Sequence, residues 1–153
     1  MPPPLTGHPF QVGIVVADVE RALRRQEELF GPADWLVVEN GPRNMHGLHV
    51  RGEPAAFSMR LALRGSDPQL ELLQPLEGPD ILSEWLARRG EGLHHLGYEV
   101  PSLDEAIARM AHAGYECIQH GYGFGPDGSG GFAYFDTERE LGYLVEAIEQ
   151  ATS

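Results

Sequence analysis

Two hydrophobic runs along the chain share one pattern. They are Phe10 to Val16 and Gly92 to Val100, and they superimpose at a constant offset of 84 residues. Each run is rich in Val, Leu or Ile and has the length of a strand. A helix-capping residue follows each run, Asp18 in the first and Ser102 in the second, and an amphipathic stretch that ends near a glycine comes next. The pattern predicts a strand leading into a helix at both places.

Further strand-like segments follow each predicted helix. They are Trp35 to Glu39, the weaker His49 to Val50, Ala56 to Leu63 and Leu70 to Gln74 in the first half, and Tyr115 to Gln119, Gly131 to Asp136 and Leu141 to Ile148 in the second. A polar loop is expected over residues 40–47. The last segments of the two halves also match each other, at a second fixed offset of 75. Internal repetition of this kind predicts two similar modules.

These elements predict a single α+β domain made of two βαβββ modules. Module one covers about residues 9–76, a linker helix about 79–90 and module two about 92–149 of the 153-residue chain. Two such modules supply about eight strands, which we expect to form a curved mixed sheet around a cleft, with the helices on its convex side.

The amino-acid composition excludes several classes of binding partner and of catalytic group. The formal net charge of −12 argues against nucleic acid and anionic membranes, which are bound by basic surfaces, and leaves a small molecule as the expected ligand. All eleven basic residues are arginines, so no lysine can form a Schiff base. Cys117 is the only cysteine, and the chain begins without a signal-like segment, so we expect a cytoplasmic protein without an intrachain disulfide.

Four polar residues stand at matched positions in the repeat: Gln11, Glu71, His95 and Glu146. Because side chains alternate across a strand, each points away from the apolar face that must pack on the helices. Taken singly, a strand Glu is usually solvated, and a lone His is as often a hydrogen-bonded structural residue as a ligand. Together they predict a site for one divalent metal ion, because a cation relieves the repulsion between two carboxylates.

The segments that carry these residues resemble the vicinal oxygen chelate superfamily, also called the glyoxalase fold. The resemblance covers residues 10–149 and is greatest to members like methylmalonyl-CoA epimerase. It rests on the motifs QVGIVVAD, LELLQPL, GLHHLGYEV and LVEAIE. It implies metal ligands at the four positions above, with Zn, Co, Ni, Mn or Mg as the ion, and a homodimer. It also implies an isomerase, epimerase or lyase that acts through a metal-stabilised enolate on a small acyl or α-hydroxycarbonyl substrate, with acyl-CoA as one such class.

The chain departs from the family pattern at several positions. Epimerases of the family commonly have His where Gln11 stands. Zinc-dependent glyoxalase I has a similar ligand set, but its expected Arg and Asn are replaced by Val15 and Pro75, which argues against that enzyme. Gln11 also argues against the iron dioxygenases, which use two His and one carboxylate.

Proton transfer needs a base near the metal. The resemblance makes Glu146 the first choice, as both ligand and base, and His46 or His49 the second, because epimerases place an extra acid in that region. The alternative is a binding or resistance protein that uses the same cleft without chemistry. The glycine-rich segment 121–131 is expected to be a loop beside the cleft rather than a dinucleotide site, since no strand-turn-helix surrounds its G-x-G-x-x-G.

Overall fold

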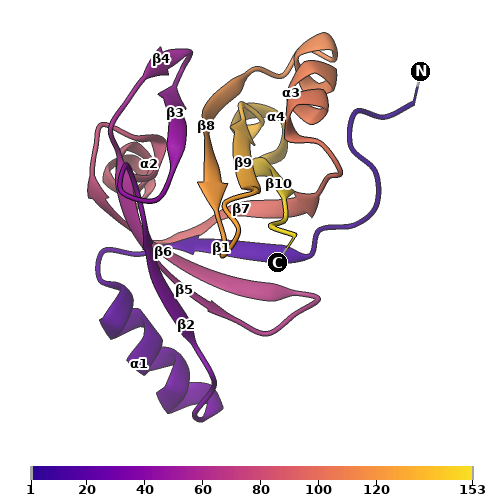
Figure 1. Cartoon of the computed structure of the whole chain (residues 1–153). Coiled ribbons are helices and arrows are strands. Elements are labelled where there is room, and N and C mark those ends of the chain that lie inside the picture. Colours follow the sequence, from indigo (N-terminus) through magenta and orange to yellow (C-terminus); the bar gives the residue numbers. More distant parts are fainter. Residues whose placement is uncertain (1, 153) are drawn as a thin grey trace.

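The computed structural model describes residues 2–152 and has the predicted α+β fold with two similar halves (Figure 1). The first half contains β1 (Gln11–Val15), α1 (Val19–Phe30), β2 (Leu36–Asn40), β3 (His46–Val50), β4 (Glu53–Pro54), β5 (Ser58–Arg64) and β6 (Gln69–Glu77). The linker helix is α2 (Ile81–Arg89). The second half contains β7 (Gly92–Glu99), α3 (Leu103–His112), β8 (Cys117–Phe124), β9 (Gly130–Phe135), α4 (Glu138–Leu141) and β10 (Leu144–Glu149).

All strands belong to one mixed sheet in the order β2-β5-β6-β1-β7-β10-β9-β8-β3-β4. The first strands of the two modules, β1 and β7, pair antiparallel at its centre. The last strand of each module lies parallel to the first, β6 beside β1 and β10 beside β7. The two halves are therefore related by an approximate twofold axis between β1 and β7, as the repeat in the sequence requires.

The sheet has ten strands rather than about eight because β3, which extends the weak strand expected at His49–Val50 back to His46, forms a hairpin with the two-residue strand β4. β3 and β4 leave the first module and pair with β8, the edge strand of the second. The backbone groups of β8 supply the pairing, so local sequence gives little sign of this strand. A second difference lies before β10, where the segment expected to begin a strand at Leu141 ends the short helix α4, and Gly142 follows in the left-handed region with φ of 86°.

Helices α1 and α3 cover the outer face of the two halves (Figure 1). Each begins at its predicted cap, since the Asp18 side chain accepts a hydrogen bond from the Arg21 N–H and the Ser102 hydroxyl accepts one from the Glu105 N–H. α1 packs Val19 against Leu72, and α3 packs Leu103, Ala106 and Met110 against β9 and β10. Because the outward residues of each strand are used in this way, the alternate residues are left to line the inner face.

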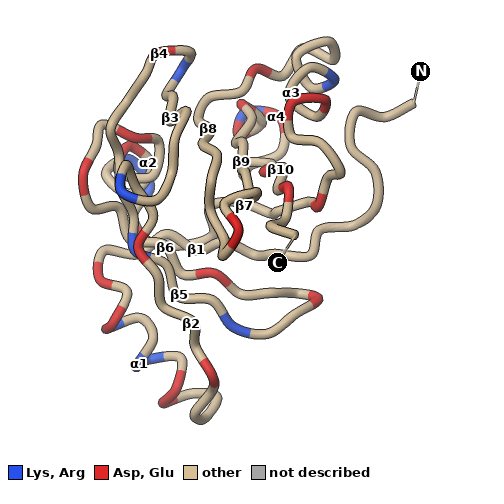
Figure 2. Tube along the Cα trace, in the orientation of Figure 1, with Lys and Arg blue, Asp and Glu red and all other residues tan. Residues whose placement is uncertain are grey.

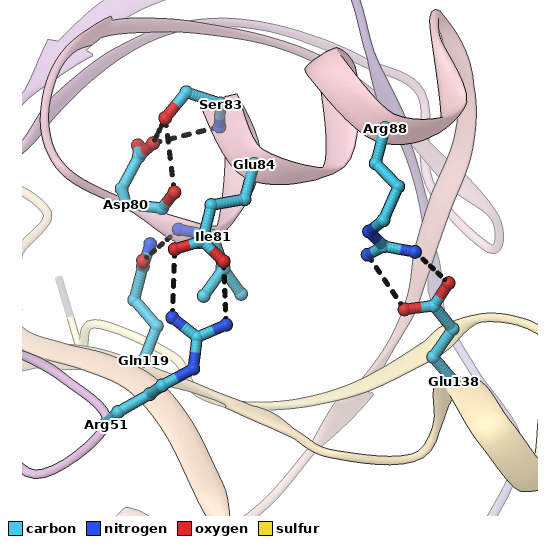
Figure 3. A network of polar contacts seen from close by, with 8 residues as sticks. All are labelled: Arg51, Asp80, Ile81, Ser83, Glu84, Arg88, Gln119 and Glu138. Atoms are coloured by element: carbon cyan, nitrogen blue, oxygen red, sulfur yellow. Dashed lines mark hydrogen bonds and ion pairs between the residues drawn. The ribbon is translucent and has the colours of Figure 1, made fainter.

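The linker helix α2 is fixed by polar contacts at both ends (Figure 3). Its capping residue Asp80 accepts from the Ser83 N–H, and the Gln119 side chain of β8 accepts from the Ile81 N–H. Bidentate ion pairs join Arg51 to Glu84 and Arg88 to Glu138. These contacts hold α2 against β8 and α4 of the second module and against the β3–β4 turn of the first, and so fix the position of its buried residue Trp85.

Acidic residues outnumber basic residues, and neither kind is confined to one part of the fold (Figure 2). Acidic positions occur on every helix and on several loops, whereas basic positions are fewer and scattered (Figure 2). No helix within residues 2–152 has the length and apolar character needed to cross a membrane.

Candidate metal centre

The four predicted ligands are brought together by the central strands of the sheet. Gln11 lies on β1, Glu71 on β6, His95 on β7 and Glu146 on β10. The register places Gly13 opposite both His95 and Glu71, and Gly97 opposite both Gln11 and Glu146. Residues opposite each other project from the same face of a sheet, so the four side chains converge on the inner face.

The His95 Nε2 atom lies at the point of convergence. It is 3.1 Å from Gln11 Oε1, 3.2 Å from Glu71 Oε1 and 3.0 Å from Glu146 Oε1. All four side chains are buried, and His95 has no exposed surface. The arrangement thus places one nitrogen and three oxygens within bonding range of a common point, away from bulk water.

Hydrogen bonding alone does not satisfy this cluster. A single N–H on Nε2 can donate well to one acceptor, whereas three acceptors face it. Within the described chain, Glu71 Oε1 and Glu146 Oε1 are buried without a hydrogen-bond partner of good geometry. Ligand atoms about 2.1 Å from an ion and at right angles to one another lie about 3.0 Å apart, close to the separations found here. The donor set therefore fits a divalent cation that accepts oxygen and nitrogen ligands.

The carboxylates govern the protonation of the histidine. Burial by itself would lower the pKa of His95, but the negative charges of Glu146 and Glu71 outweigh it and raise this pKa to about 10. Burial raises the pKa of Glu146, and the positive charge of His95 opposes that rise. Without a metal ion the proton on His95 acts as the cation that holds the carboxylates together.

Two neighbouring residues orient the ligands. The Gln11 Nε2 group donates to Gln69 Oε1 at 2.7 Å, which turns Gln11 Oε1 toward His95. His95 Nδ1 lies 2.9 Å from His94 Nδ1, so one of these nitrogens donates and the other accepts. If His95 presents its Nε2 lone pair to an ion, its Nδ1 carries the proton and His94 is the acceptor.

His94 is held from behind by aromatic rings. It has no exposed surface, and its ring meets Trp85 of α2 edge-on at 4.9 Å and Tyr134 of β9 at 5.3 Å. Burial lowers the pKa of His94 well below its usual value, so it is a neutral acceptor. A chain of contacts thus runs from the linker helix through Trp85 and His94 to the proposed ligand His95.

The ligand cluster forms the floor of a cavity of about 530 Å³. Gln11, Glu71 and Glu146 line it, together with Phe132 and Tyr134 of β9. Its opposite wall comes from β2, β5 and β6, and Phe124, Gly125 and Pro126 of the glycine-rich loop close one side. The loop therefore borders the cavity, as its sequence suggested.

The two histidines predicted as second-choice bases lie elsewhere. Both are on β3, and neither belongs to the residues of the described chain that line the cavity. His46 is exposed and stacks on Tyr122, with ring centroids 6.1 Å apart. His49 stacks on His120 at 4.8 Å, and its Nδ1 lies 3.0 Å from the Gly47 carbonyl oxygen. Their catalytic role stays a prediction and draws no support from this placement.

Tyr134 is a cavity residue to which the sequence assigned no specific role. It pairs with Glu146 across β9 and β10, and its ring meets the His95 ring at 5.0 Å. Burial raises the pKa of Tyr134 well above its usual value, so its hydroxyl keeps its proton, and that hydroxyl acts as a hydrogen-bond donor toward Glu146. The only signal in the sequence was its spacing of two from Phe132, which puts both on one face.

Comparisons with known proteins agree with this fold. A family model described as the Glyoxalase/Bleomycin resistance protein/Dioxygenase superfamily matches residues 10–135. A comparison with curated proteins found no match.

Three solved structures illustrate the similarity. Methylmalonyl-CoA epimerase from Mycobacterium tuberculosis has 25% identity and a TM-score of 0.62, over 99% of this chain and 92% of that one. A variant of the Streptomyces coelicolor methylmalonyl-CoA epimerase, in complex with 2-nitronate-propionyl-CoA, has 18% identity and a TM-score of 0.60, over 95% and 98%. A hypothetical protein from Bacillus halodurans C-125 has 21% identity and a TM-score of 0.63, over 94% of both chains.

The family model spans most of the chain, and the two-module sheet described above is the fold that these structures share. This chain therefore belongs to the Glyoxalase/Bleomycin resistance protein/Dioxygenase superfamily.

Proposed function

We propose that the protein is a divalent-metal-dependent isomerase or epimerase, or a related lyase, that removes and returns a proton next to a carbonyl group. The observation that carries the proposal is the convergence of three buried oxygens on His95 Nε2 at the floor of an open cavity. Three buried oxygen acceptors face a single N–H donor, and an excess of buried hydrogen-bond acceptors over donors indicates a cation-binding site. Its position at a cavity floor indicates that the cation meets a small molecule.

The similar structures support the choice of reaction. Two of those named above are methylmalonyl-CoA epimerases, and one of them was solved with an acyl-CoA analogue. Epimerisation beside a thioester requires loss of the α proton and its return to either face. The substrate class that fits is a carbonyl compound with an acidic α hydrogen, such as an acyl thioester or an α-hydroxycarbonyl compound.

Four residues would hold the ion: Gln11, Glu71, His95 and Glu146. A divalent ion at this point supplies Lewis-acid stabilisation of the negative charge that develops on the substrate oxygen. Gln11 is neutral and is oriented by Gln69, so it adds an oxygen ligand without adding charge. The two carboxylates balance the charge of the ion.

Glu146 is the residue that we assign as the base. Its carboxylate lines the cavity beside the position proposed for the ion, and carboxylates are among the side chains that act as general bases. The Tyr134 hydroxyl beside it can donate a hydrogen bond when the carboxylate is charged. Tyr134 thereby positions Glu146 while the proton moves between Glu146 and the α carbon.

Uptake of deuterium at the α carbon from heavy water tests the proposal. The metal-loaded protein is incubated with a panel of acyl-CoA and α-hydroxycarbonyl compounds, and mass spectrometry measures the exchange. We expect exchange with at least one compound, and its loss on chelation and in Glu146→Gln. Binding of a compound without exchange, across the panel and with metal present, would instead indicate a sequestering or resistance protein that uses the same cavity.

A further inference from the structure

Gln69 of β6 stands in one row of side chains with two of the proposed ligands. It pairs with Gln11 of β1, and both Gln11 and Glu146 lie opposite Gly97 of β7. Side chains that lie opposite each other project from the same face, so Gln69 belongs to the inner face beside the metal centre. It is half-buried there and lines the cavity. Gln69 therefore borders both the metal centre and the space open to a substrate.

The contact between Gln11 and Gln69 fixes the direction of both side-chain amides. An amide binds a metal ion through its oxygen, so Gln11 Oε1 faces the ion site and its Nε2 group needs an acceptor elsewhere. That acceptor is Gln69 Oε1, at 2.7 Å. The oxygen of the Gln69 amide is thus directed at Gln11, and its nitrogen is directed away from Gln11.

The Gln69 Nε2 group is free to bind a ligand. Among residues 2–152, no group accepts a hydrogen bond from it, and it is not one of the polar atoms that burial leaves without a partner. A side-chain amide nitrogen carries two N–H donors. Because Gln69 lines the cavity, these donors are open to a molecule bound there.

The repeat shows that the fold does not require a polar side chain at this position. At the offset of 75 residues that relates the last strands of the two modules, Gln69 falls on Leu144. Leu144 lies opposite His95 and is buried in the hydrophobic core. Gln69 lies opposite Gln11 in the same way. A leucine therefore suffices for packing beside a ligand, and the amide of Gln69 is a departure from the repeat that packing does not explain.

A substrate whose carbonyl oxygen meets the ion would have its next atoms close to Gln69, because only the Gln11 amide separates Gln69 from the ion site. A second oxygen in that part of the substrate can accept a hydrogen bond from the Gln69 N–H groups. Such a donor would also stabilise negative charge that spreads to the second oxygen when the α proton leaves.

We propose that Gln69 is a substrate-binding residue, and that one amide group serves both the ion and the substrate. Its oxygen accepts from the ligand Gln11, and its N–H groups donate to a second acceptor oxygen of the substrate, such as a second carbonyl oxygen. The identity of the reacting carbonyl compound rests on the proposed function. The donor role is measured by binding and needs no turnover.

Two thioesters that differ by one oxygen measure this donor. Acetoacetyl-CoA has a carbonyl group at its third carbon, where butanoyl-CoA has a methylene group. Calorimetry with the metal-loaded full chain gives the affinity of each thioester for the wild-type protein and for Gln69→Leu. We expect the variant to weaken binding of acetoacetyl-CoA about ten-fold more than binding of butanoyl-CoA, the value of one hydrogen bond. Equal losses for the two thioesters, or no binding of acetoacetyl-CoA to the wild-type protein, would overturn the proposal.

Gln69→Glu separates the two halves of the amide. Its carboxylate still accepts from Gln11 Nε2 but cannot donate. Metal affinity, measured by chelator competition, should fall by no more than about three-fold in Gln69→Glu and by about ten-fold or more in Gln69→Leu, which lacks the acceptor. Gln69→Glu should nevertheless lose the preference for acetoacetyl-CoA. A variant that keeps this preference would contradict the donor role, and equal metal affinity in all three proteins would contradict the acceptor role.

Gln150→Glu is the matched control for the added charge. Gln150 is another amide that lines the cavity, and it is exposed just beyond the end of β10. We expect this variant to keep the preference for acetoacetyl-CoA. An equal loss in Gln150→Glu and Gln69→Glu would show that charge, and not the missing donor, decides the preference.

Deuterium uptake at the α carbon, followed with the panel of acyl-CoA compounds named above, distinguishes this proposal from the proposed function. The expected response of binding to Gln69→Leu, without uptake into any compound, would contradict the proposed function and leave the role of Gln69 standing. Uptake by the wild-type protein, with equal losses of binding for the two thioesters in Gln69→Leu, would support the proposed function and overturn the role of Gln69.

Discussion

Gly13 lies directly opposite His95 across the β1 and β7 pair, and the imidazole ring of His95 occupies the space where a Gly13 side chain would be. A Cβ atom on Gly13 would approach three atoms of the ring more closely than 3.0 Å, the limit that real Cβ atoms essentially respect. Its repeat counterpart Gly97 lies opposite Gln11 in the same way. The two glycines of the repeated motif thus make room for the two ligands of the central strands.

Gly13→Ala should therefore displace His95 and weaken metal binding by at least about ten-fold, since ligand orientation controls affinity. The backbone of Gly13 is not in the left-handed region, so the effect comes from lost space alone. We expect the free energy of unfolding to fall by about 1–3 kcal/mol, the usual cost of overpacking. Chelator competition and urea denaturation measure the two effects.

Gly97→Ala is the matched control for this variant. The nearest atom to a Cβ on Gly97 is Ile148 Cδ1 at 2.8 Å, the far end of a flexible side chain that can move. Its effect on metal affinity should be the smaller one. A larger loss of metal affinity in Gly97→Ala than in Gly13→Ala would contradict the claim that Gly13 makes room for the His95 ring.

His94 should affect the metal through His95. His94→Asn can keep a hydrogen-bond acceptor near the position of Nδ1, whereas His94→Leu cannot. We expect His94→Leu to weaken metal binding by about 10- to 100-fold, the usual result of losing such a partner, and His94→Asn to restore part of the loss. If both variants lose affinity equally in step with thermal stability, the role of His94 is only to fill space.

Metal affinity should depend on pH through His95. Without metal its pKa is raised to about 10 by the two carboxylates, so a divalent ion must displace a proton at neutral pH. Affinity should rise as pH increases toward 10, and calorimetry in buffers of different ionisation enthalpy should detect release of about one proton or more. Affinity independent of pH between about 6.5 and 8.5 would contradict a protonated His95 in the metal-free protein.

The same shift predicts how stable the metal-free protein is. A histidine whose pKa is raised in the folded state stabilises it fully below its ordinary pKa of 6.5, and this contribution is lost as pH rises through about 10. Urea denaturation of the chelated protein should show falling stability over that range. Glu146→Gln should flatten the fall, because it removes the leading source of the raised pKa.

Tyr134→Phe tests the hydrogen bond to Glu146. Metal affinity should stay within about two-fold, because Tyr134 is not a proposed ligand, and α-deuterium exchange should slow by about ten-fold, the value of one hydrogen bond. His46→Asn and His49→Asn serve as comparisons on β3. If either variant slows exchange more than Tyr134→Phe does, His46 or His49 is a better candidate for the second proton-transfer residue than the structure indicates.

The repeat made most of this fold predictable. The sequence offsets that align Gln11 with His95 and Glu71 with Glu146 indicate two modules related by an approximate twofold axis. That symmetry places the first strands of the two modules, β1 and β7, side by side at the centre of the sheet. A weak strand was expected at His49–Val50, but its extension to His46 and its pairing were not, because the partner strand β8 lies about 70 residues further along the chain and local residues such as Gly47 do not favour a strand. Likewise Gln69 and Tyr134 contact ligands on other strands, Gln11 and Glu146, and the pattern along the sequence does not show those contacts.

Two further expectations concern properties of the protein in solution. The homodimer and the cytoplasmic location stay predictions. Sedimentation equilibrium decides the first of them, and a monomer at working concentration would contradict it.

Metal content of the purified protein tests the proposed centre most directly. Protein prepared without chelator, analysed by mass spectrometry of its elements, should carry close to one divalent ion per chain, and Glu71→Gln and His95→Ala should each lose most of it. Wild-type protein that binds no divalent ion even after incubation with Zn, Co, Ni, Mn or Mg, or variants that retain the wild-type content, would show that the four side chains do not form a metal site.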